Sequence, residues 1–407
     1  MHIAMDDLSL VFSKAFDIIE IEQLGVSEHH SMRVAALCVL MGRRQGFDSD
    51  ALAALATCAL FHDNALTEFI VSKRRHKIPQ VNLRRHCEGG QRNVAWLPFM
   101  QSVDGFVLYH HECGDGTGPF KKREGEFPLE AALIAAADQV DASFHLQRVS
   151  RENFGALRTT IAARIGTIST REAMETLLEV LDAETLERLR DENIHASLKA
   201  LLPPWQLAAG DRRVIRLGGF IAHVVDHKSY FTRRHSEQIA NRVWLISGHY
   251  GYAPEERMQL FLAAALHDIG KIVTPLDILE KPGSLTHEEF AVVKDHARQT
   301  HDWLGEVAGL GKIRNWASEH HETLDGSGYP LGLRAEELDF NSRLIACIDI
   351  YQAVCEERPY HAARSHQETM PILYSMADKG KLDAKIVRDI DEIMAGCSLR
   401  DIPPPPA

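Results

Sequence analysis

The sequence predicts an all-α protein that is built from two tandem helical bundles. Three observations support this prediction: the length of 407 residues, a repeat of polar residues, and helix start signals without long alternating β patterns. A chain of this length exceeds what a single hydrophobic core usually holds, so two domains are expected.

The repeat relates the two halves of the chain. The segment HHECGDGTGPF at 110–120 has a near twin, HHETLDGSGYP, at 320–330. Further polar positions recur in the same order with only two small changes in spacing: His30 with His235, His62-Asp63 with His267-Asp268, His86 with His296, and Asp138 with Asp349. This order indicates a tandem duplication of one module.

Helix start signals precede several of these repeated residues. Pro254 followed by two glutamates predicts the first turn of a helix that runs toward His267. Thr286 and Glu289 form a capping box ahead of the segment that contains His296.

Similar signals precede the two repeated aspartates. Pro128 and Glu130 predict the start of the helix with Asp138, and Asn341 is expected to cap the helix with Asp349. The D-G-x-G stretches are expected to be loops, because glycine permits turns that helices do not. Each module is therefore predicted to be a bundle of five to seven helices.

The domain boundaries are predicted from the positions of proline residues and from the end of the amphipathic helical pattern. The first module with trailing helices is expected at 1–200 and is interpreted as regulatory or structural, and the second, catalytic module at 207–400. The helix-breaking segment LLPPWQ at 201–206 separates them, and the proline-rich tail at 401–407 is expected to be disordered.

Composition excludes some partners. The net charge is −12 and Lys and Arg are not clustered, so duplex nucleic acid is not expected to bind. No apolar run approaches the length of a membrane span, and the first residues lack the pattern of a secretory signal. The odd set of seven cysteines, without a C-x-x-C pair, indicates reduced thiols in the cytoplasm. Whether the chain forms a homodimer is left open.

The second module contains a set of metal-ligand types. Imidazole and carboxylate together suit Mn, Fe, Ni or Zn, and seven donors are too many for one ion. Two ions, with Asp268 or a hydroxide between them, would use all seven: His235, His267, Asp268, His296, His320, His321 and Asp349.

The motifs that contain these residues resemble the HD-GYP family of bacterial phosphodiesterases, a subset of the HD phosphohydrolases. The resemblance covers roughly 215–400 and, in degraded form, about 15–145. It implies HD-type helical bundles, a centre of two or three metal ions with iron or manganese favoured, and cleavage of cyclic di-GMP. It rests on HS-x-x-x-A at 235–240, HDIGK at 267–271, His296, HHE-x-x-DGSGYP at 320–330 and D-I-Y-x-A at 349–353.

The resemblance also assigns roles. Family members with three metals have a glutamate four residues before the first histidine, whereas this chain has Phe231, so two ions are expected. Asp268 and Lys271 are expected to be catalytic. Lys271, Tyr329 and Arg358 are expected to contact substrate.

The chain departs from the family at two positions. His361 stands where a lysine is common, and Gln352 replaces a common aspartate. The chemistry can also be stated without the family: paired cations activate water and stabilise the leaving oxygen, while Lys271 and Arg358 add fixed positive charge.

The first module keeps a second candidate set of metal ligands but not the phosphate contacts. Leu66, Pro119 and Gln147 stand at the positions of Lys271, Tyr329 and Arg358. This module is therefore expected to be a poor hydrolase that acts as a sensor or dimerisation platform, with or without metal. Its ligand set is His30, His62, Asp63, His86, His110, His111 and Asp138.

The predicted function is metal-dependent hydrolysis of a cyclic dinucleotide to the linear dinucleotide or mononucleotides. Cyclic di-GMP is the default substrate, and 3',3'-cyclic GMP-AMP is a serious alternative. Two other hypotheses stay open at this point. One is an HD phosphohydrolase that acts on another nucleotide, and the other is a non-catalytic effector that binds the dinucleotide.

Overall fold

The computed structural model describes residues 2–66, 82–228, 234–281, 283–356 and 363–396. The chain divides into two compact units. One unit contains residues 4–206, and the other contains residues 207–407 together with residues 1–3. The division falls directly after LLPPWQ, where helix α10 has ended at Leu201.

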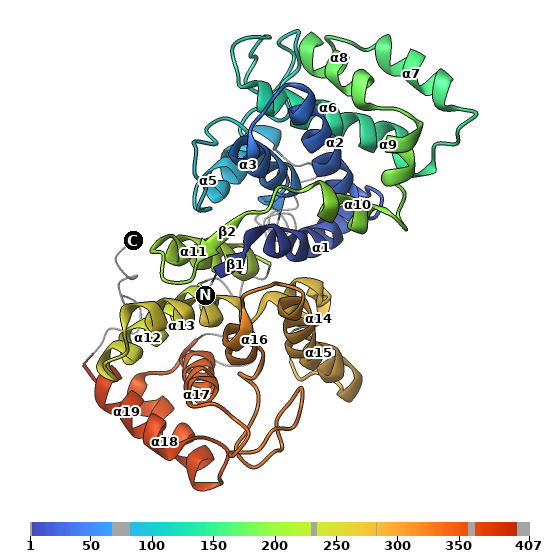
Figure 1. Cartoon of the computed structure of the whole chain (residues 1–407). Coiled ribbons are helices and arrows are strands. Elements are labelled where there is room, and N and C mark those ends of the chain that lie inside the picture. The colour runs from blue at the N-terminus through green and yellow to red at the C-terminus, as the bar shows by residue number, and fades with distance from the viewer. Residues whose placement is uncertain (1, 67–81, 229–233, 282, 357–362, 397–407) are drawn as a thin grey trace. The chain divides into compact units, whose positions relative to one another are not determined.

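Both units are helical (Figure 1). The first contains α1 (Met5–Leu24), α2 (His30–Arg44), α3 (Ser49–Leu60), α5 (Leu83–Val94), α6 (Leu129–Phe144), the 3-10 helix η1 (Leu146–Arg148), α7 (Phe154–Ala162), α8 (Arg171–Val180), α9 (Ala183–Arg188) and α10 (Ile194–Leu201). The second contains α11 (Arg213–Asp226), α12 (His235–His249), α13 (Pro254–Leu266), the 3-10 helix η3 (Ile269–Val273), α14 (Leu276–Leu279), α15 (His287–Gly305), α16 (Gly311–Ser318), α17 (Phe340–Cys355), α18 (His366–Asp378) and α19 (Ala384–Met394). Two short strands, β1 (His2–Ala4) and β2 (Gln206–Ala208), pair with each other.

The two units share a packing plan. In the first, α2 packs against α3 and α6; in the second, α12 packs against α13 and α17. The helices at these contacts are rich in buried alanine, such as Ala263–Ala265 in α13 and Ala135–Ala137 in α6. Small side chains let helix axes approach closely, so the segments that follow these helices meet inside each bundle.

Most of the predicted helix starts are confirmed. Helix α13 begins at Pro254, and Thr286 forms a capping box with Glu289 at the start of α15. Pro128 directly precedes α6. The assignment of Asn341 as a cap was wrong, because Asp339 accepts from the backbone N–H of Asn341 and takes that role.

The second unit has nine α-helices among its described residues, more than the five to seven expected. The excess comes from short helices such as α14, which spans four residues. A helix of one turn has no hydrophobic periodicity, so the sequence pattern could not identify it. The all-α class itself is confirmed.

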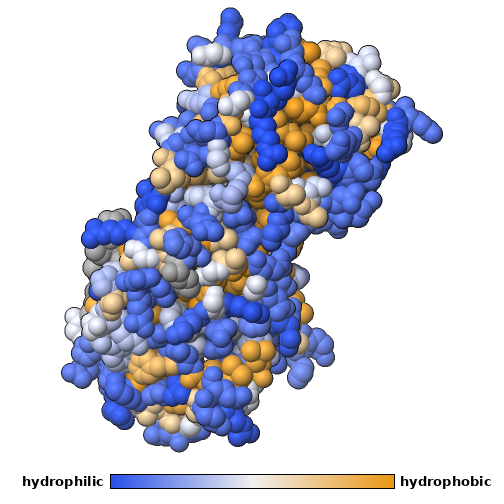
Figure 2. All heavy atoms as spheres, in the orientation of Figure 1, coloured by the Kyte–Doolittle hydropathy of each residue, from blue (hydrophilic) through white to orange (hydrophobic). Residues whose placement is uncertain are grey.

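Hydrophilic side chains cover most of the visible face of each unit (Figure 2). None of the helices in the described part of the chain has the length and the apolar content needed to cross a bilayer. All six cysteines within the described residues are free, and five of them are buried.

Candidate metal centres

The second unit brings all seven predicted ligands together, each from the end or the inner face of a helix. His235 is the first residue of α12, and Asp349 lies inside α17. His267 and Asp268 lie in the turn between α13 and η3, at the end of the helix that the sequence predicted to run toward His267. The remaining three ligands are His296 in α15, and His320 and His321 directly after the C-cap of α16.

Asp268 lies between two groups of histidines. Its Oδ2 is 3.1 Å from His267 Nε2 and 3.8 Å from His235 Nε2. Its Oδ1 is 3.3 Å from His296 Nε2 and 3.7 Å from His320 Nε2. One carboxylate therefore presents each oxygen to a different pair of imidazoles, the arrangement that a ligand shared by two ions requires.

Asp349 connects the same two groups on another side. Its Oδ1 is 3.3 Å from His235 Nε2, and its Oδ2 is 3.7 Å from His321 Nδ1. The ligand atoms of His235, His267 and Asp268 lie within 4.8 Å of one another, as do those of His296, His320 and His321. The donors thus form two adjacent clusters.

Three of these histidines are oriented by the backbone. The Nδ1 of His267 bonds the carbonyl of Ala264 at 2.7 Å, and that of His320 bonds the carbonyl of Ala317 at 2.7 Å. His296 makes the same contact with the residue three positions earlier. Because each carbonyl accepts a hydrogen bond from the Nδ1–H, Nε2 carries the lone pair that a metal binds.

Burial keeps the imidazoles of His296 and His321 neutral. Burial and the nearby Lys271 lower the pKa of His296 to about 3. Burial also lowers the pKa of His321 to about 4. Although burial raises the pKa of Asp268, His267 and Lys271 outweigh it, so that pKa lies well below its usual range.

The site fits divalent transition metals. His267 Nε2 and Asp268 Oδ1 are buried without a hydrogen-bond partner among the described residues. Buried polar atoms in that state are costly unless something binds them. The mixture of imidazole and carboxylate suits iron or manganese and also admits nickel or zinc, so the donors leave the metal's identity open.

A glutamate that sequence reasoning missed supports His235. Glu356 Oε2 is 2.8 Å from His235 Nδ1, and Gln352 donates to the other oxygen of Glu356. In the first unit, Asp141 at the position of Gln352 is 2.7 Å from His30 Nδ1. Gln352 is therefore not a lost contact, because a carboxylate one turn further along α17 takes the same role.

Two of the predicted substrate contacts lie beside this centre. Lys271 Nζ donates to Asp268 Oδ2. The ring of Tyr329 lies 4.7 Å from the ring of His321, and burial raises the pKa of the Tyr329 phenol. The other residues that the resemblance singled out, Arg358, His361 and Phe231, lie outside the described residues.

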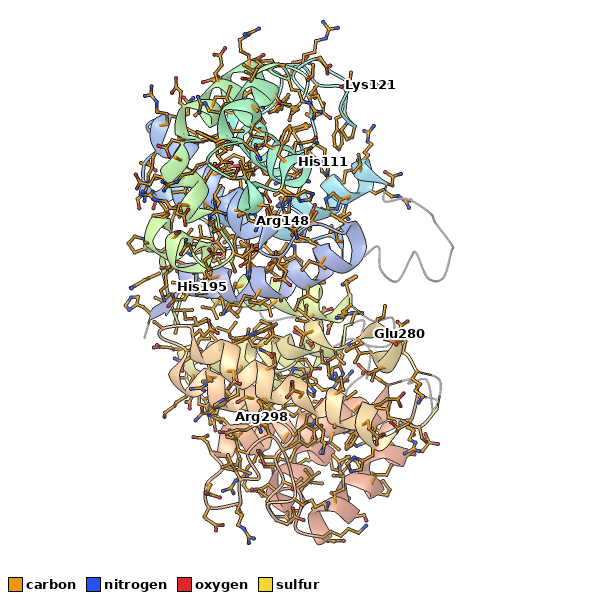
Figure 3. All side chains as sticks on the ribbon, turned by 90° about the vertical axis from the view of Figure 1, so that its right-hand side faces the viewer. His111, Lys121, Arg148, His195, Glu280 and Arg298 are labelled. Atoms are coloured by element: carbon orange, nitrogen blue, oxygen red, sulfur yellow. The ribbon has the colours of Figure 1, made fainter. Side chains whose placement is uncertain are left out.

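Two cations on α15 lie near Tyr329 and the loop that contains it. Lys294 Nζ is 5.9 Å from the centroid of the Tyr329 ring and 5.1 Å from that of Phe290, which is exposed. Arg298, labelled in Figure 3, donates to the carbonyl of Pro330 at 3.5 Å. Both residues lie within two positions of His296, and their proximity to it was the only signal in the sequence.

The repeated loop is held by a buried glutamate. Glu322 accepts from the backbone N–H groups of Leu331, Gly332 and Leu333 at 2.6–3.1 Å. In the first unit, Glu112 accepts in the same way from Phe120 and Lys122. This explains why the glutamate of HHE recurs although it is not a predicted ligand.

The glycine of HDIGK has a packing role. A Cβ on Gly270 would lie 2.1 Å from the carbonyl oxygen of His296. Gly270 N also donates to Thr300 Oγ1, which itself donates to the carbonyl of His267. The close approach of η3 to α15 positions His267 and His296 relative to each other.

The first unit assembles its own seven predicted ligands in the same pattern. Asp63 Oδ1 is 2.8 Å from His86 Nε2 and 3.7 Å from His110 Nε2, and its Oδ2 is 3.8 Å from His62 Nε2. Asp138 Oδ1 is 3.1 Å from His30 Nε2.

Asp138 also reaches the second histidine of the pair. Its Oδ2 is 3.9 Å from His111 Nδ1, and burial lowers the pKa of His111 to about 3. In Figure 3, His111 lies further inside the unit than Lys121, which is on the outer part of the glycine loop.

The surroundings of this first centre are different. Leu66, at the position of Lys271, is 2% exposed and supplies no charge. Pro119 stands at the position of Tyr329, and Gln147 is buried at the position of Arg358. The first centre therefore has the ligand types of the second without the lysine and the tyrosine that lie beside it.

Comparisons with known proteins agree with this duplication. Residues 220–386 and residues 28–143 each match the HD domain family. The chain is 29% identical over 382 residues to the 3'3'-cGAMP-specific phosphodiesterase 1 of Vibrio cholerae. The matched region covers 90% of this chain and 87% of the relative. It is 30% identical over 314 residues to the 3'3'-cGAMP-specific phosphodiesterase 3 of that organism, covering 76% of this chain and 67% of the relative.

A solved structure shares the fold. The crystal structure of a cyclic GMP-AMP specific phosphodiesterase of V. cholerae, V-cGAP3, matches 98% of this chain and 99% of its own with a TM-score of 0.63 at 21% identity. Tandem HD domains, a buried His/Asp ligand set in each unit and these relatives together give one conclusion. The chain belongs to the HD-GYP-like family of cyclic dinucleotide phosphodiesterases with tandem HD domains.

Proposed function

We propose that the second unit hydrolyses 3',3'-cyclic GMP-AMP, with cyclic di-GMP as the second substrate to test. Sequence reasoning placed these two substrates in the opposite order. Two relatives that match over parts of both units are named for 3'3'-cGAMP. This similarity supports placing 3',3'-cyclic GMP-AMP ahead of cyclic di-GMP as the substrate.

One observation supports the catalytic assignment most. Asp268 presents its two oxygens to two separate pairs of histidines, with Lys271 bonded to the same carboxylate. Divalent ions bound by these donors would supply an activated water and neutralise charge on the phosphodiester. The expected ligands are His235, His267, Asp268, His296, His320, His321 and Asp349.

The protein's own groups position the substrate. Lys271, half-buried beside Asp268, places a fixed positive charge where the phosphodiester must bind. The Tyr329 ring offers a face on which a purine base can stack, and Lys294 lies near that ring. The water oxygen forms a bond to phosphorus, the P–O bond to the sugar oxygen on the opposite side breaks, and that sugar oxygen takes up the proton that water loses.

We further propose that the first unit is a metal-holding regulatory or structural module of a cytoplasmic enzyme. Its ligands are retained, whereas Leu66 replaces the lysine that would bind phosphate. A buried leucine at that point leaves a phosphodiester without a cationic contact, so turnover is assigned to the second unit alone.

The test is turnover of three cyclic dinucleotides by the purified full chain after reconstitution with Mn or Fe. Wild type is expected to linearise 3',3'-cyclic GMP-AMP fastest, cyclic di-GMP more slowly and cyclic di-AMP least. Asp268→Ala is expected to linearise none. Tight binding without turnover by wild type would favour the effector hypothesis, and turnover of (p)ppGpp alone would favour a different nucleotide phosphohydrolase.

A further inference from the structure

Phe290 is an aromatic side chain on the surface of α15 that neither the ligand set nor the hydrophobic core explains. It is 46% exposed and lies near the start of the helix that carries His296. A single exposed apolar side chain is ordinary on a protein surface. Phe290 differs from that case because its neighbours connect it to the candidate metal centre.

The connection consists of two aromatic rings with a cation between them. Lys294 Nζ lies over both rings, 5.1 Å from the centroid of Phe290 and 5.9 Å from that of Tyr329. The Tyr329 ring is in turn 4.7 Å from the ring of His321, one of the predicted ligands. Tyr329 is half-buried and Phe290 is exposed, so this row of side chains runs from a metal ligand to the solvent.

The charge of Lys294 is available to an anion. Within the described residues Lys294 forms no salt bridge. Arg84 is its counterpart in the first unit, since it precedes His86 by two positions as Lys294 precedes His296. Arg84 also lies over a ring, but its Nε is 3.2 Å from Glu88 Oε1. A carboxylate therefore competes with any anion for the cation of the first unit, whereas the second unit keeps its cation unpaired by the described acids.

The proposed substrate has groups that the contacts described so far do not use. A cyclic dinucleotide contains two phosphodiesters and two bases. The bound ions and Lys271 serve the phosphodiester that is cleaved, and the Tyr329 ring serves one base. The other phosphodiester carries a negative charge, and the other base has an aromatic face. An ammonium group between two aromatic rings offers contacts of both types.

We propose that Phe290 and Lys294 form the subsite for the part of the cyclic dinucleotide that is not cleaved. Lys294 pairs with the second phosphodiester, and the second base stacks on Phe290. This inference rests on the proposed function of the second unit. Stacking on a phenyl ring depends little on the identity of the base. The subsite therefore selects a cyclic dinucleotide over a smaller phosphodiester and does not distinguish guanine from adenine.

The test compares two substrates of the Mn²⁺-loaded full chain: 3',3'-cyclic GMP-AMP and methyl 4-nitrophenyl phosphate, which has one phosphodiester and one ring. Phe290→Ala is expected to raise KM for the cyclic dinucleotide about fivefold with kcat unchanged. It is expected to leave kcat/KM for the small substrate within about twofold. Lys294→Met, which keeps an unbranched side chain without the charge, is expected to raise KM about threefold and to make it less sensitive to salt.

Two substitutions that keep the chemistry are expected to restore binding. Phe290→Tyr retains the ring and Lys294→Arg retains the charge, so both are expected to have the KM of wild type. Val292→Ala is the matched control, because Val292 is 40% exposed on the same helix but two positions on, on another face. It is expected to change no kinetic constant. Since Phe290 is exposed, Phe290→Ala is expected to fold, and its melting temperature checks this.

The outcomes separate the inference from the proposed function. If wild type cleaves no cyclic dinucleotide, the proposed function is wrong and the inference falls with it. If wild type cleaves 3',3'-cyclic GMP-AMP and Phe290→Ala leaves its KM unchanged, Phe290 does not contact substrate. An equal loss on both substrates would show a general disturbance of the site. In either of these two cases only the inference is overturned.

Discussion

The two candidate metal centres have the same seven donor residues in the same order, yet their surroundings differ. Around the second centre, Lys271 bonds the connecting aspartate and Tyr329 lies against His321. Around the first, Leu66 and Pro119 stand at those positions. A ligand set that closes a helical core is retained, because losing one donor leaves the others buried and unpartnered. Residues that only contact substrate have no such constraint.

The glycine loops support the same distinction. Residues 111–120 and 321–330 show the same position-by-position burial, with one fully buried residue, Glu112 or Glu322. Asp115 and Asp325 each accept from the residue two positions on, Thr117 or Ser327. The loop scaffold is therefore the same in both units, but the second loop has Tyr329 beside His321, where the first has Pro119.

The largest expected difference between the modules comes from the connecting aspartates. Asp268→Asn removes one charge from the ligand that both histidine pairs face, and turnover is expected to fall roughly 1000-fold. The equivalent Asp63→Asn is expected to leave turnover within about twofold and to release metal from the first unit. Steady-state assays and metal analysis of both variants check this. Equal losses of activity would show that both modules are catalytic.

The next largest effect is expected from the phosphate contact. Lys271→Met removes a positive charge beside the scissile bond, so kcat is expected to fall about 100-fold while bound metal stays unchanged. Leu66→Met is the matched control and is expected to change neither quantity. If Lys271→Met instead released metal, the lysine would act by holding Asp268 in place.

A smaller effect is expected from the residues behind the first histidine of each centre. Glu356→Gln weakens the acceptor of His235 Nδ1, and metal affinity of the second unit is expected to fall about tenfold. Asp141→Asn makes the equivalent change at His30 and is expected to act on the first unit's metal alone. Chelator titrations followed by activity and metal content distinguish the two. An effect of Glu356→Gln on kcat at saturating metal would contradict a role limited to orienting His235.

The smallest effect is expected at Lys294, the cation on α15 near the Tyr329 ring. Lys294→Ala removes a cation near the Tyr329 ring, and KM is expected to rise about threefold with kcat unchanged. Its counterpart, Arg84, lies 4.9 Å from the Phe120 ring in the first unit, and Arg84→Ala is expected to leave KM unchanged. Initial rates over a range of substrate concentrations measure both. A drop in kcat alone would show that Lys294 acts in the reaction step and not in substrate binding.

The contrast between these predictions depends on what the sequence could and could not supply. The helix starts at Pro254 and Thr286 follow from local chemistry, because proline and the capping box act within one turn. The ligands could be found because each is repeated in order in the other half. The regular helical architecture needed no knowledge of contacts between distant segments.

The sequence pattern could not identify the residues that contact the ligands from behind, and the reason is physical. Glu356 meets His235 across 121 positions of chain, and no spacing rule connects them. Lys294 contacts Tyr329 because α15 runs beside the glycine loop.

The sequence by itself determined the class of fold, the duplication and the set of donor side chains, because helix periodicity, capping and repeated order are properties of neighbouring residues. Only the tertiary structure decided that Asp268 faces two pairs of histidines and that Glu356 replaces the acceptor lost at Gln352. Those facts depend on which helix faces meet, and side-chain packing across distant segments sets that.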